Sequence, residues 1–352
     1  MTLLEAQATS EAKANAFLGK IVTDWGATVG SALVVIGDKL GLYDALAKAG
    51  PLTSAGLAQR TGTNERYCRE WLLAQAAGGY LEYDQASCRY TLPPEHAAVL
   101  GMVIGGFEMM NALTRAEPRI VEAFRSGGGM SWGEHHHDVF EGCERFFRPG
   151  YEQHLISEWI PALDGIEAKL QAGGWIADVG CGHGASTLIM AQAYPVSWYV
   201  GVDSHAGSIE RARQAAGIDL GGRVRFEAAD ATAFGGPSGG YDLISFFDCV
   251  HDMVDPVGAL RHAASRLAPQ GSILMVEPAA GERTEDNLNP VGRVYASCSV
   301  LVCTPNSMAG GGRALGTVAS EAQLREVAFE AGLGSFRRVG ETPFNRIFEL
   351  RH

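Results

Sequence analysis

The sequence predicts an α/β protein in which a helix-covered parallel sheet follows a mainly helical N-terminal domain. From Ile166 onward, short apolar runs alternate with helical segments, which is the pattern of strands and crossover helices in a doubly wound, Rossmann-like sheet. Between residues 14 and 95, apolar residues recur at helical spacing, and two short runs of strand-forming residues follow them. With 352 residues, the chain is long enough for two domains that each bury a core.

Composition excludes several classes of protein. Hydrophobic residues make up 46% and charged residues 19%, as in ordinary globular proteins, and the net charge of −12 argues against a nucleic-acid binder. The seven cysteines form no C-x-x-C pair, so we expect a reduced, cytoplasmic protein without a disulfide framework. We expect no signal peptide, and no membrane span, because the most apolar stretch, Ala97 to Leu113, is short and interrupted by polar residues.

The segment 1–95 is predicted to be a winged helix. Helices are expected over residues 14–49, after a cap at Thr53 or Ser54, and after a cap at Asn64. Two strands, Tyr80–Tyr83 and Cys88–Leu92, would form the wing. The segment from Gly41 to Glu95 contains five basic and six acidic residues, so it lacks the excess of basic residues that DNA binding requires. A dimerisation and lid module is therefore favoured over a DNA-binding one.

Residues 96–165 are predicted to link the two domains. The glycines 127–129 are a candidate hinge, and the methionine-rich helix before them is either core or an adaptable wall for a substrate. The cluster His135, His136 and His137 lacks a compatible cysteine pair, so we expect a solvated or pocket-rim cluster and no metal site.

A glycine-rich turn is the strongest functional pattern. An apolar strand at Trp175–Val179 runs into Gly180, Gly182 and Gly184, and a helix follows from Ala185 to Gln192. Glycines allow a ligand to approach the backbone, and the helix start offers free N–H groups. The turn therefore predicts a site for a nucleotide-like cofactor.

Two kinds of cofactor fit this turn. Gly180, Gly182 and Ala185 satisfy the dinucleotide pattern G-x-G-x-x-G/A. Asp178, however, suits a cation and opposes a phosphate. The stretch from Asp178 to Gly184, D-x-G-x-G-x-G, resembles motif I of the class I S-adenosylmethionine-dependent methyltransferases. The resemblance implies that this loop packs on the amino acid end of S-adenosylmethionine, as part of the methyltransferase type of sheet.

Two more acids follow the next predicted strands. Asp203 ends the strand Trp198–Asp203, where a carboxylate can accept hydrogen bonds from both ribose hydroxyls of either cofactor. Asp230 and Ala231 follow the strand Val224–Ala228, and in the family an acid here bonds the adenine amino group. The alternative for Asp230 is a loop aspartate that caps a turn. The resemblance also implies that Tyr151, in an aromatic segment before the sheet, covers the cofactor, unless it serves only domain packing. Phe247 completes the cofactor set.

The catalytic candidates are His251 and Glu277. The strand Tyr241–Phe247 ends in Asp-Cys-Val-His-Asp-Met, which resembles the His-Asp-Trp segment of plant-type O-methyltransferases, with Met253 in place of tryptophan. The resemblance implies that His251 is the general base and that Glu277, which closes the strand Gly271–Pro278, orients it. The alternatives are a histidine that caps the next helix and a structural acid.

The resemblance thus implies an S-adenosylmethionine-dependent methyltransferase domain at 166–352, similar to bacterial and plant small-molecule O-methyltransferases. We expect in-line transfer to an oxygen atom of a small, largely apolar substrate, in a homodimer that binds neither nucleic acid nor membrane. The alternatives are a nicotinamide-dependent oxidoreductase and a winged-helix transcription regulator that senses the cofactor. The magnesium pattern of catechol-type enzymes is not recognisable around Asp248 and Asp252.

Overall fold

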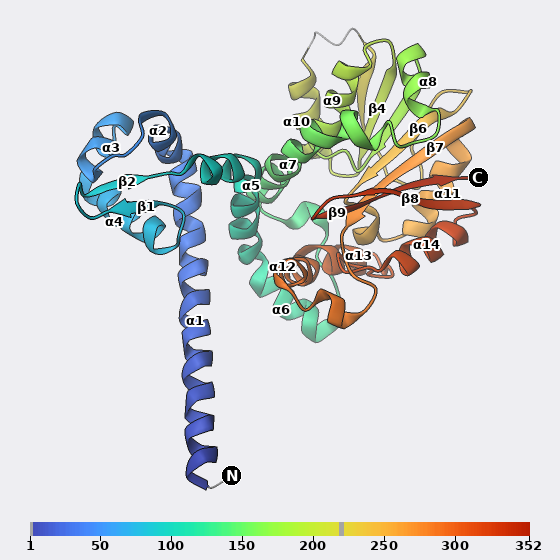
Figure 1. Cartoon of the computed structure of the whole chain (residues 1–352). Coiled ribbons are helices and arrows are strands. Elements are labelled where there is room, and N and C mark those ends of the chain that lie inside the picture. The colour runs from blue at the N-terminus through green and yellow to red at the C-terminus, as the bar shows by residue number, and fades with distance from the viewer. Residues whose placement is uncertain (1–2, 218–221) are drawn as a thin grey trace. The chain divides into compact units, whose positions relative to one another are not determined.

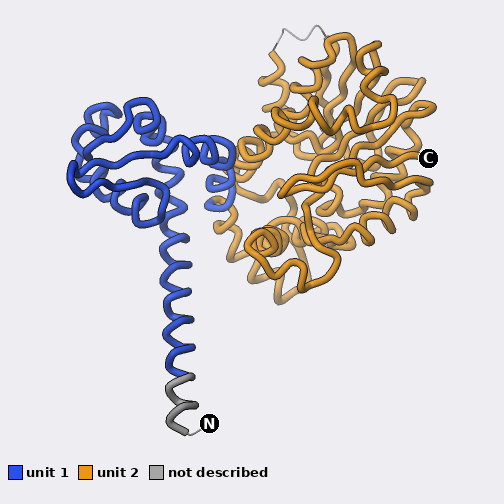
Figure 2. The backbone as a smooth tube through the Cα atoms, viewed as in Figure 1, with its two compact units in different colours: residues 1–111 blue, residues 112–352 orange. Residues whose placement is uncertain are grey.

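The computed structural model describes residues 3–217 and 222–352, which divide into two compact units (Figures 1 and 2). The first unit runs to Asn111 and the second covers Ala112–His352. The division falls inside the segment 96–165 that we predict to be a linker.

The first unit has the helix, helix, hairpin order of a winged helix, as predicted. Its caps are the predicted ones, because the side chain of Thr53 accepts from Gly56 N–H and that of Asn64 from Arg66 N–H. Leu46, Leu57 and Leu72 are buried at its centre. Its elements are α1 (Leu3–Lys39), α2 (Leu42–Ala49), α3 (Ser54–Thr61), α4 (Glu65–Ala77), β1 (Glu82–Asp84), β2 (Arg89–Thr91) and most of α5 (Pro94–Leu113).

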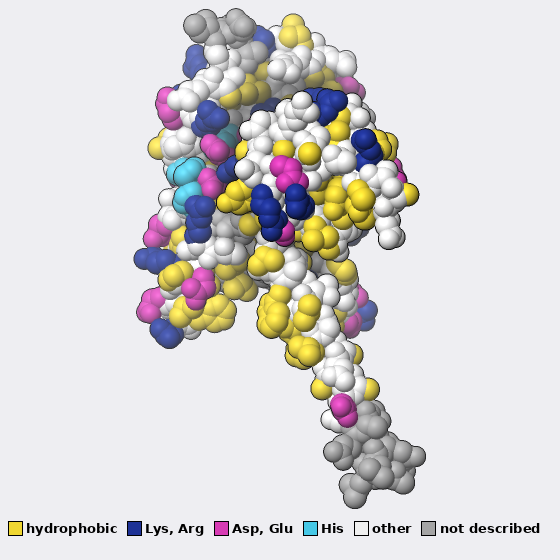
Figure 3. All heavy atoms as spheres, turned by 90° about the vertical axis from the view of Figure 1, so that its left-hand side faces the viewer, with side chains coloured by type: hydrophobic (Ala, Val, Ile, Leu, Met, Phe, Trp, Pro, Cys, Tyr) yellow, Lys and Arg dark blue, Asp and Glu magenta, His cyan; other side chains and the backbone are white. Residues whose placement is uncertain are grey.

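Helix α1 carries an exposed apolar stripe. Leu18, Val22, Trp25, Val29 and Ile36 are separated by three, four or seven residues, so they share one face of the helix. The side chains of Trp25 and Val29 are 64% and 69% exposed. Figure 3 shows hydrophobic side chains gathered along this helix. We call these five residues the α1 stripe.

Among the described residues, two helical segments have the length and composition of a membrane span, Ser10–Lys39 and Pro94–Ser126. The second contains the stretch that the sequence suggested was too short to span a membrane, because α5 continues through a short 3-10 turn into α6 (Glu117–Ser126). Core helices of soluble proteins pass the same test, and about a third of the second window is buried.

Four further helical segments precede the sheet in the second unit: η2 (Trp132–Glu134), α7 (His137–Gly150), the π-helix η3 (Tyr151–Trp159) and α8 (Ile166–Ala172). The candidate hinge glycines do not form a free hinge. Gly127 ends α6 with φ of 70°, whereas a Cβ on Gly129 would lie 2.2 Å from both Ala309 N and Pro305 O. Gly129 therefore allows close packing of two backbones.

A seven-stranded sheet in the described part of the second unit has the order β5-β4-β3-β6-β7-β9-β8. The first five strands in this order are parallel. Strand β9 is antiparallel to β7, and β8, at the edge of the sheet, is antiparallel to β9. The strands are β3 (Trp175–Val179), β4 (Trp198–Asp203), β5 (Val224–Ala228), β6 (Tyr241–Phe247), β7 (Leu267–Pro278), β8 (Ser335–Glu341) and β9 (Asn345–Arg351). The bounds of β3, β4, β5 and β6 are the predicted ones, and β7 begins four residues before the predicted start at Gly271.

Helices cover both faces of this sheet (Figure 1). One core includes residues of α11 (Pro256–Arg266) and α14 (Glu321–Glu330), and the other includes residues of η3, α8 and α9 (Ala185–Ala193). Helix α10 (Ala206–Ala216) contacts β4 and β5. The carboxyl ends of β3, β4, β5 and β6 therefore lie along one edge of the sheet, where the predicted site residues follow them.

The segment 289–312, which has no clear strand pattern in the sequence, is helical up to Ala309. It forms α12 (Pro290–Cys298), the π-helix η6 (Ser299–Cys303) and α13 (Thr304–Ala309). Asn289 caps α12 by accepting a hydrogen bond from Gly292 N–H.

Candidate functional site

The glycine turn after β3 has the backbone shape that only glycine adopts without strain. The φ angles of Gly180, Gly182 and Gly184 are 75°, 52° and 82°. A Cβ on Gly180 would lie 2.8 Å from Cys249 Sγ, and one on Gly184 would lie 2.7 Å from a ring carbon of Phe226. A Cβ on Gly182 would meet no heavy atom within 4 Å. Gly180 and Gly184 therefore allow close packing, whereas Gly182 leaves the open backbone that a ligand can approach.

Asp178 holds this turn together. Its buried carboxylate accepts hydrogen bonds from Ser186 Oγ at 2.6 Å and Thr187 Oγ1 at 2.5 Å, both in the first turn of α9. A third bond, of 3.0 Å, comes from Ser245 Oγ on β6. Burial raises the pKa of Asp178, and the three hydroxyl groups oppose that shift. Asp178 therefore joins two strands and a helix, and its negative charge lies beneath the turn.

Asp203 lies beside the open glycine. Its Oδ2 accepts from Gly182 N–H at 2.9 Å, and its Oδ1 accepts from His205 N–H at 2.8 Å. Burial raises its pKa, and the two backbone donors oppose the shift. Each carboxylate oxygen keeps a lone pair, so Asp203 can accept two ribose hydroxyls while remaining fixed by the backbone.

Asp230 is exposed and makes its hydrogen bonds within its own turn. Its Oδ1 accepts from the N–H and the hydroxyl of Thr232, at 2.8 Å and 2.6 Å. This is the turn geometry that we gave as the alternative role. Because Ala228 pairs with Asp203 across β5 and β4, Asp230 lies just beyond the same edge of the sheet. Ala231 packs against the core beside it.

Aromatic rings cluster between η3 and β6. The ring centroid of Tyr151 lies 5.1 Å from that of Phe247 and 6.2 Å from that of Trp159. All three rings are buried. Burial, and then the nearby Asp248, raise the pKa of Tyr151, so its hydroxyl stays protonated. Tyr151 and Phe247 are thus together, and Tyr151 opens a π-helix, a rare element that is frequent at functional sites.

His251 and Glu277 form a buried pair, in η4 (Val250–Asp252) and at the end of β7. His251 Nδ1 lies 2.6 Å from Glu277 Oε2, and Glu277 Oε1 accepts from Val250 N–H at 2.9 Å. Burial opposes the charging of the imidazole, but the Glu277 carboxylate outweighs it and raises the pKa of His251 well above its ordinary value. The thiol of Cys303, on η6, lies close enough to His251 to interact with its imidazole.

Two residues of this region were not among the predicted site residues. Cys303 comes from the helical segment 289–312, and no pattern in the sequence links it to His251. Asp248 follows β6 with a φ of 49°, a left-handed conformation that is uncommon outside glycine. Burial raises its pKa to about 8, and that of Asp252 to about 7. The position of Asp248 directly after a predicted strand was a signal in the sequence, but its left-handed backbone conformation was not predictable.

The three adjacent histidines, His135 to His137, lie in different environments. His135 is buried, and burial lowers its pKa, so the expectation of a solvated or pocket-rim cluster is wrong for this residue. The ligand atoms of His136, His137 and Asp138 lie within 4.8 Å of one another. Arg115 Nη2 lies 3.4 Å from Asp138 Oδ2, and His136 Nδ1 accepts from Asp138 N–H, so both groups already have partners.

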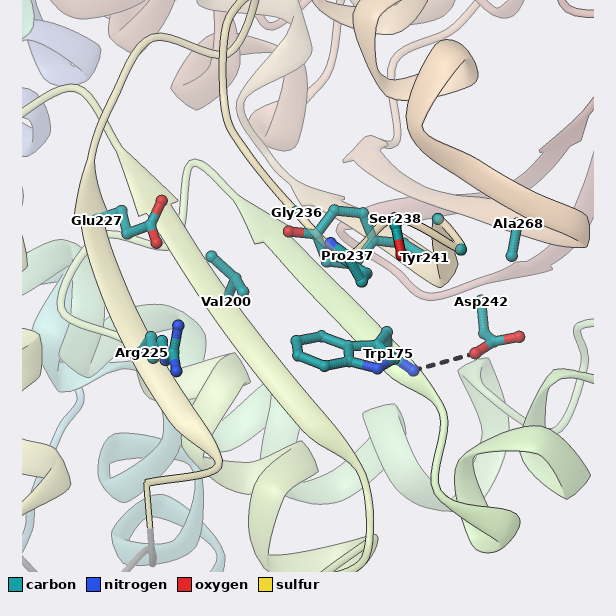
Figure 4. A pocket seen from close by; sticks show the side chains of 12 residues that line it. Trp175, Val200, Arg225, Glu227, Gly236, Pro237, Ser238, Tyr241, Asp242 and Ala268 are labelled. Atoms are coloured by element: carbon teal, nitrogen blue, oxygen red, sulfur yellow. Dashed lines mark hydrogen bonds between the residues drawn. The ribbon is translucent and has the colours of Figure 1, made fainter.

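A groove of about 710 Å³ lies near the opposite ends of the strands (Figure 4). Its lining includes Trp175, the first residue of β3, and Tyr241, the first residue of β6. Figure 4 shows the hydrogen bond that the backbone N–H of Trp175 donates to Asp242 Oδ2, with an N···O distance of 3.0 Å. Ligands of such sheets bind at the carboxyl ends of the strands, so we assign no function to this groove.

Two family models match the chain. Residues 28–102 match the Rv2258c-like winged HTH domain, and residues 170–327 match a methyltransferase domain. The second match covers the glycine turn, the three acids and the His251–Glu277 pair. It bears out the methyltransferase type of sheet, and the first match bears out the winged helix.

Curated relatives match only part of the chain. The 27-O-demethylrifamycin SV methyltransferase of Amycolatopsis mediterranei is 32% identical over 131 residues, which are 35% of this chain and 48% of that protein. Phosphoethanolamine N-methyltransferase 3 of Arabidopsis thaliana is 30% identical over 145 residues, which are 40% of this chain and 28% of that protein. The chain thus spans about half, or less, of the length of these relatives.

Solved structures share the fold over nearly the whole chain. The mitomycin 7-O-methyltransferase MmcR has a TM-score of 0.65 at 18% identity, over 99% of this chain and 100% of that one. Human N-acetylserotonin methyltransferase, solved with S-adenosylmethionine, has a TM-score of 0.63 at 18% identity, over 95% of this chain and 97% of that one. At this identity the likeness shows the fold alone.

Proposed function

We propose that this chain, a class I S-adenosylmethionine-dependent methyltransferase with an N-terminal winged-helix domain, methylates an oxygen atom of a small, largely apolar molecule. The observation that carries the proposal is the buried His251–Glu277 pair, which follows two neighbouring strands at the same edge of the sheet as the glycine turn. A base at this place suits a hydroxyl nucleophile, which must lose a proton when it is methylated.

The residues present fit the cofactor. The bare backbone at Gly182 and the carboxylate of Asp203 would hold its ribose side, and Asp178, Gly180 and Gly184 would maintain the turn. We assign Asp230 and Ala231 to the adenine, and Tyr151 and Phe247 to the cover over the cofactor. When bound, S-adenosylmethionine supplies a methyl group that its sulfonium makes electrophilic.

The protein's own contribution is a positioned base. Glu277 accepts the Nδ1 proton of His251, which leaves Nε2 to take the proton of the substrate hydroxyl. The imidazolium that forms is stabilised by the same carboxylate. Because Glu277 also raises the pKa of His251, the base is stronger but is neutral in a smaller fraction of molecules near pH 7. Proximity and alignment of the hydroxyl supply the rest of the rate.

Binding and turnover measurements test this function. We expect calorimetry to show S-adenosylhomocysteine binding and to show no binding of NADH. We also expect a radiolabelled methyl group to move from S-adenosylmethionine to members of a panel of phenols and alcohols, with base-stable product as for an ether. Binding of NADH without S-adenosylhomocysteine would favour an oxidoreductase, and transfer confined to amines would exclude oxygen as the acceptor.

The α1 stripe supports a homodimer in which a second copy covers it. Its apolar residues follow the three-and-four spacing by which helices pack on one another, and a single chain leaves them exposed. The balanced charge of residues 41–95 gives no reason to place DNA on the winged helix. We expect the enzyme to act in the cytoplasm, where its seven free thiols stay reduced.

A further inference from the structure

Asp248 has one carboxylate oxygen that the protein leaves without a partner. Its Oδ1 accepts from Asn345 Nδ2 at 2.7 Å, and its backbone N–H donates to Val276 O at 2.8 Å. Its Oδ2 is shielded from solvent and has no hydrogen-bond partner among the described residues. A buried, unsatisfied carboxylate oxygen is costly, so such a group in a native site calls for an explanation.

The surroundings of Asp248 are negative. The nearby ionisable groups include Glu277, Asp252 and His251, and the cationic form of His251 is already paired with Glu277. Burial, followed by Glu277, raises the pKa of Asp248 to about 8, which is the behaviour of an acid that lacks a cation. A positively charged group brought next to it would restore the carboxylate and gain a charge-assisted hydrogen bond.

The groups found near the Asp248 carboxylate lie outside the glycine turn. Asn345 on β9 bonds the carboxylate, and the side chains of Cys143 on α7, Tyr151 on η3 and Tyr295 on α12 lie within electrostatic range. The next residue, Cys249, has the opposite arrangement, because its side chain would contact a Cβ placed on Gly180 and lies near Asp178 and Asp203. Asp248 therefore belongs to the part of the site beside His251 that a substrate would occupy.

We propose that Asp248 is a specificity-determining residue that binds a protonated amino group of the substrate, so that the preferred substrates are hydroxylated amines. This assignment rests on the proposed function, since His251 must accept the proton of the hydroxyl. Asn345 fixes Oδ1 and leaves Oδ2 for the ammonium group. The terminal torsion of an aspartate is broad, so a small rotation brings Oδ2 toward the ligand. No covalent step is involved.

Two probes that differ by the amino group test the assignment. Tyramine and 4-ethylphenol share a phenol ring and a two-carbon side chain, and tyramine alone carries an ammonium. Calorimetry is done on the full chain saturated with S-adenosylhomocysteine. We expect the wild-type protein to bind tyramine about tenfold or more tightly than 4-ethylphenol, the scale of one buried charge-assisted hydrogen bond. We expect Asp248→Asn, which keeps the shape of the side chain, to abolish that preference.

A matched control is Asp242→Asn, at the opposite end of β6, which should keep the preference. The proposal is overturned if the wild-type protein binds tyramine no more tightly than 4-ethylphenol, a test that needs no variant to fold. It is also overturned if Asp248→Asn binds S-adenosylhomocysteine about tenfold more weakly, because Asp248 would then hold the amino group of the cofactor. Failure of the proposed function is separate, since it would show as absence of S-adenosylhomocysteine binding to the wild-type protein.

Discussion

Replacing Asp203 with alanine should weaken cofactor binding strongly, whereas a matched substitution elsewhere in the sheet should leave it unchanged. The carboxylate is held by Gly182 N–H and His205 N–H, and it has one further lone pair on each oxygen for a ribose hydroxyl. A hydrogen bond to a charged group contributes about 1.5–3 kcal/mol, so two of them at the lower end amount to about 3 kcal/mol. At about 1.4 kcal/mol per tenfold, we expect Asp203→Ala to raise the Kd of S-adenosylhomocysteine about 100-fold in calorimetry.

The matched control is Asp242→Ala, because Asp242 also accepts a backbone N–H of the sheet, from Trp175, but at the far end. It should bind S-adenosylhomocysteine with the wild-type Kd. Both variants lose a carboxylate that caps a backbone donor, so both should lose about 1–3 kcal/mol of unfolding free energy in urea titrations. An affinity of Asp203→Ala within threefold of wild type would refute the ribose assignment.

Three further predictions follow from the site and the surface. His251→Asn should keep S-adenosylhomocysteine binding and lower kcat about 100-fold or more; in the wild-type protein kcat/KM should rise with pH through a pKa above the ordinary value near 6.5, and Glu277→Gln should move that rise to lower pH. Gly184→Ala, at φ 82°, should cost about 2 kcal/mol of unfolding free energy in urea titrations. Val29→Glu should convert a dimer into a monomer in light scattering.

Each of these has its own contrary outcome. The base assignment fails if His251→Asn turns over as fast as the wild-type protein, and the role of Glu277 fails if the pH profile does not move. The packing argument at the turn is contradicted if Gly184→Ala unfolds like the wild-type protein. For the α1 stripe the control is Ala27→Glu, on another face of the same helix and also exposed. A dimer that survives Val29→Glu, or that Ala27→Glu also dissociates, excludes the stripe as its interface.

The contribution of His251 to stability depends on its positive charge and therefore on pH. Its pKa is raised in the folded protein, so the contribution of the His251–Glu277 pair to stability is fully present below the unfolded pKa of about 6.5. It is lost as the pH rises through the folded pKa. The fraction of neutral, catalytically active imidazole rises over the same pH interval. As the pH rises, activity should therefore increase while this part of the stability decreases.

The central strands were predictable because they are buried on both faces. Runs such as Tyr241–Phe247 must be apolar when helices cover both sides of a parallel sheet, so their bounds are visible in the sequence. The meeting of His251 with Glu277 was also within reach, because the carboxyl ends of adjacent parallel strands share one edge. The helical segment 289–312 was not, because its glycines and prolines obscure the helical periodicity.

What each acid does depended on contacts that no pattern contains. Asp178 was predicted as the acid that suits a cationic cofactor, yet three hydroxyl groups from α9 and β6 take up its oxygens. Asp248 was considered in the sequence only with Asp252, as part of a magnesium pattern that is not recognisable. In the structure it has a left-handed backbone conformation and a carboxylate oxygen without a hydrogen-bond partner. The difference lies in whether neighbouring strands and helices bring donors to the carboxylate, which is decided in three dimensions.

The acids nevertheless favour one class of cofactor as a group. Asp178 lies beneath the glycine turn and Asp203 beside it, and both are fixed by hydrogen bonds that hold them in place when a ligand arrives. At an effective dielectric constant near 20, a charge 5 Å from a carboxylate gains or loses about 3 kcal/mol. A pyrophosphate at this turn would meet that penalty from each acid, whereas a ligand with a sulfonium and an ammonium group would be attracted by both. Protonating the two acids should therefore weaken S-adenosylmethionine more than S-adenosylhomocysteine, which lacks the sulfonium charge; equal losses of affinity as the pH falls would show that the acids act through the ribose and the fold alone.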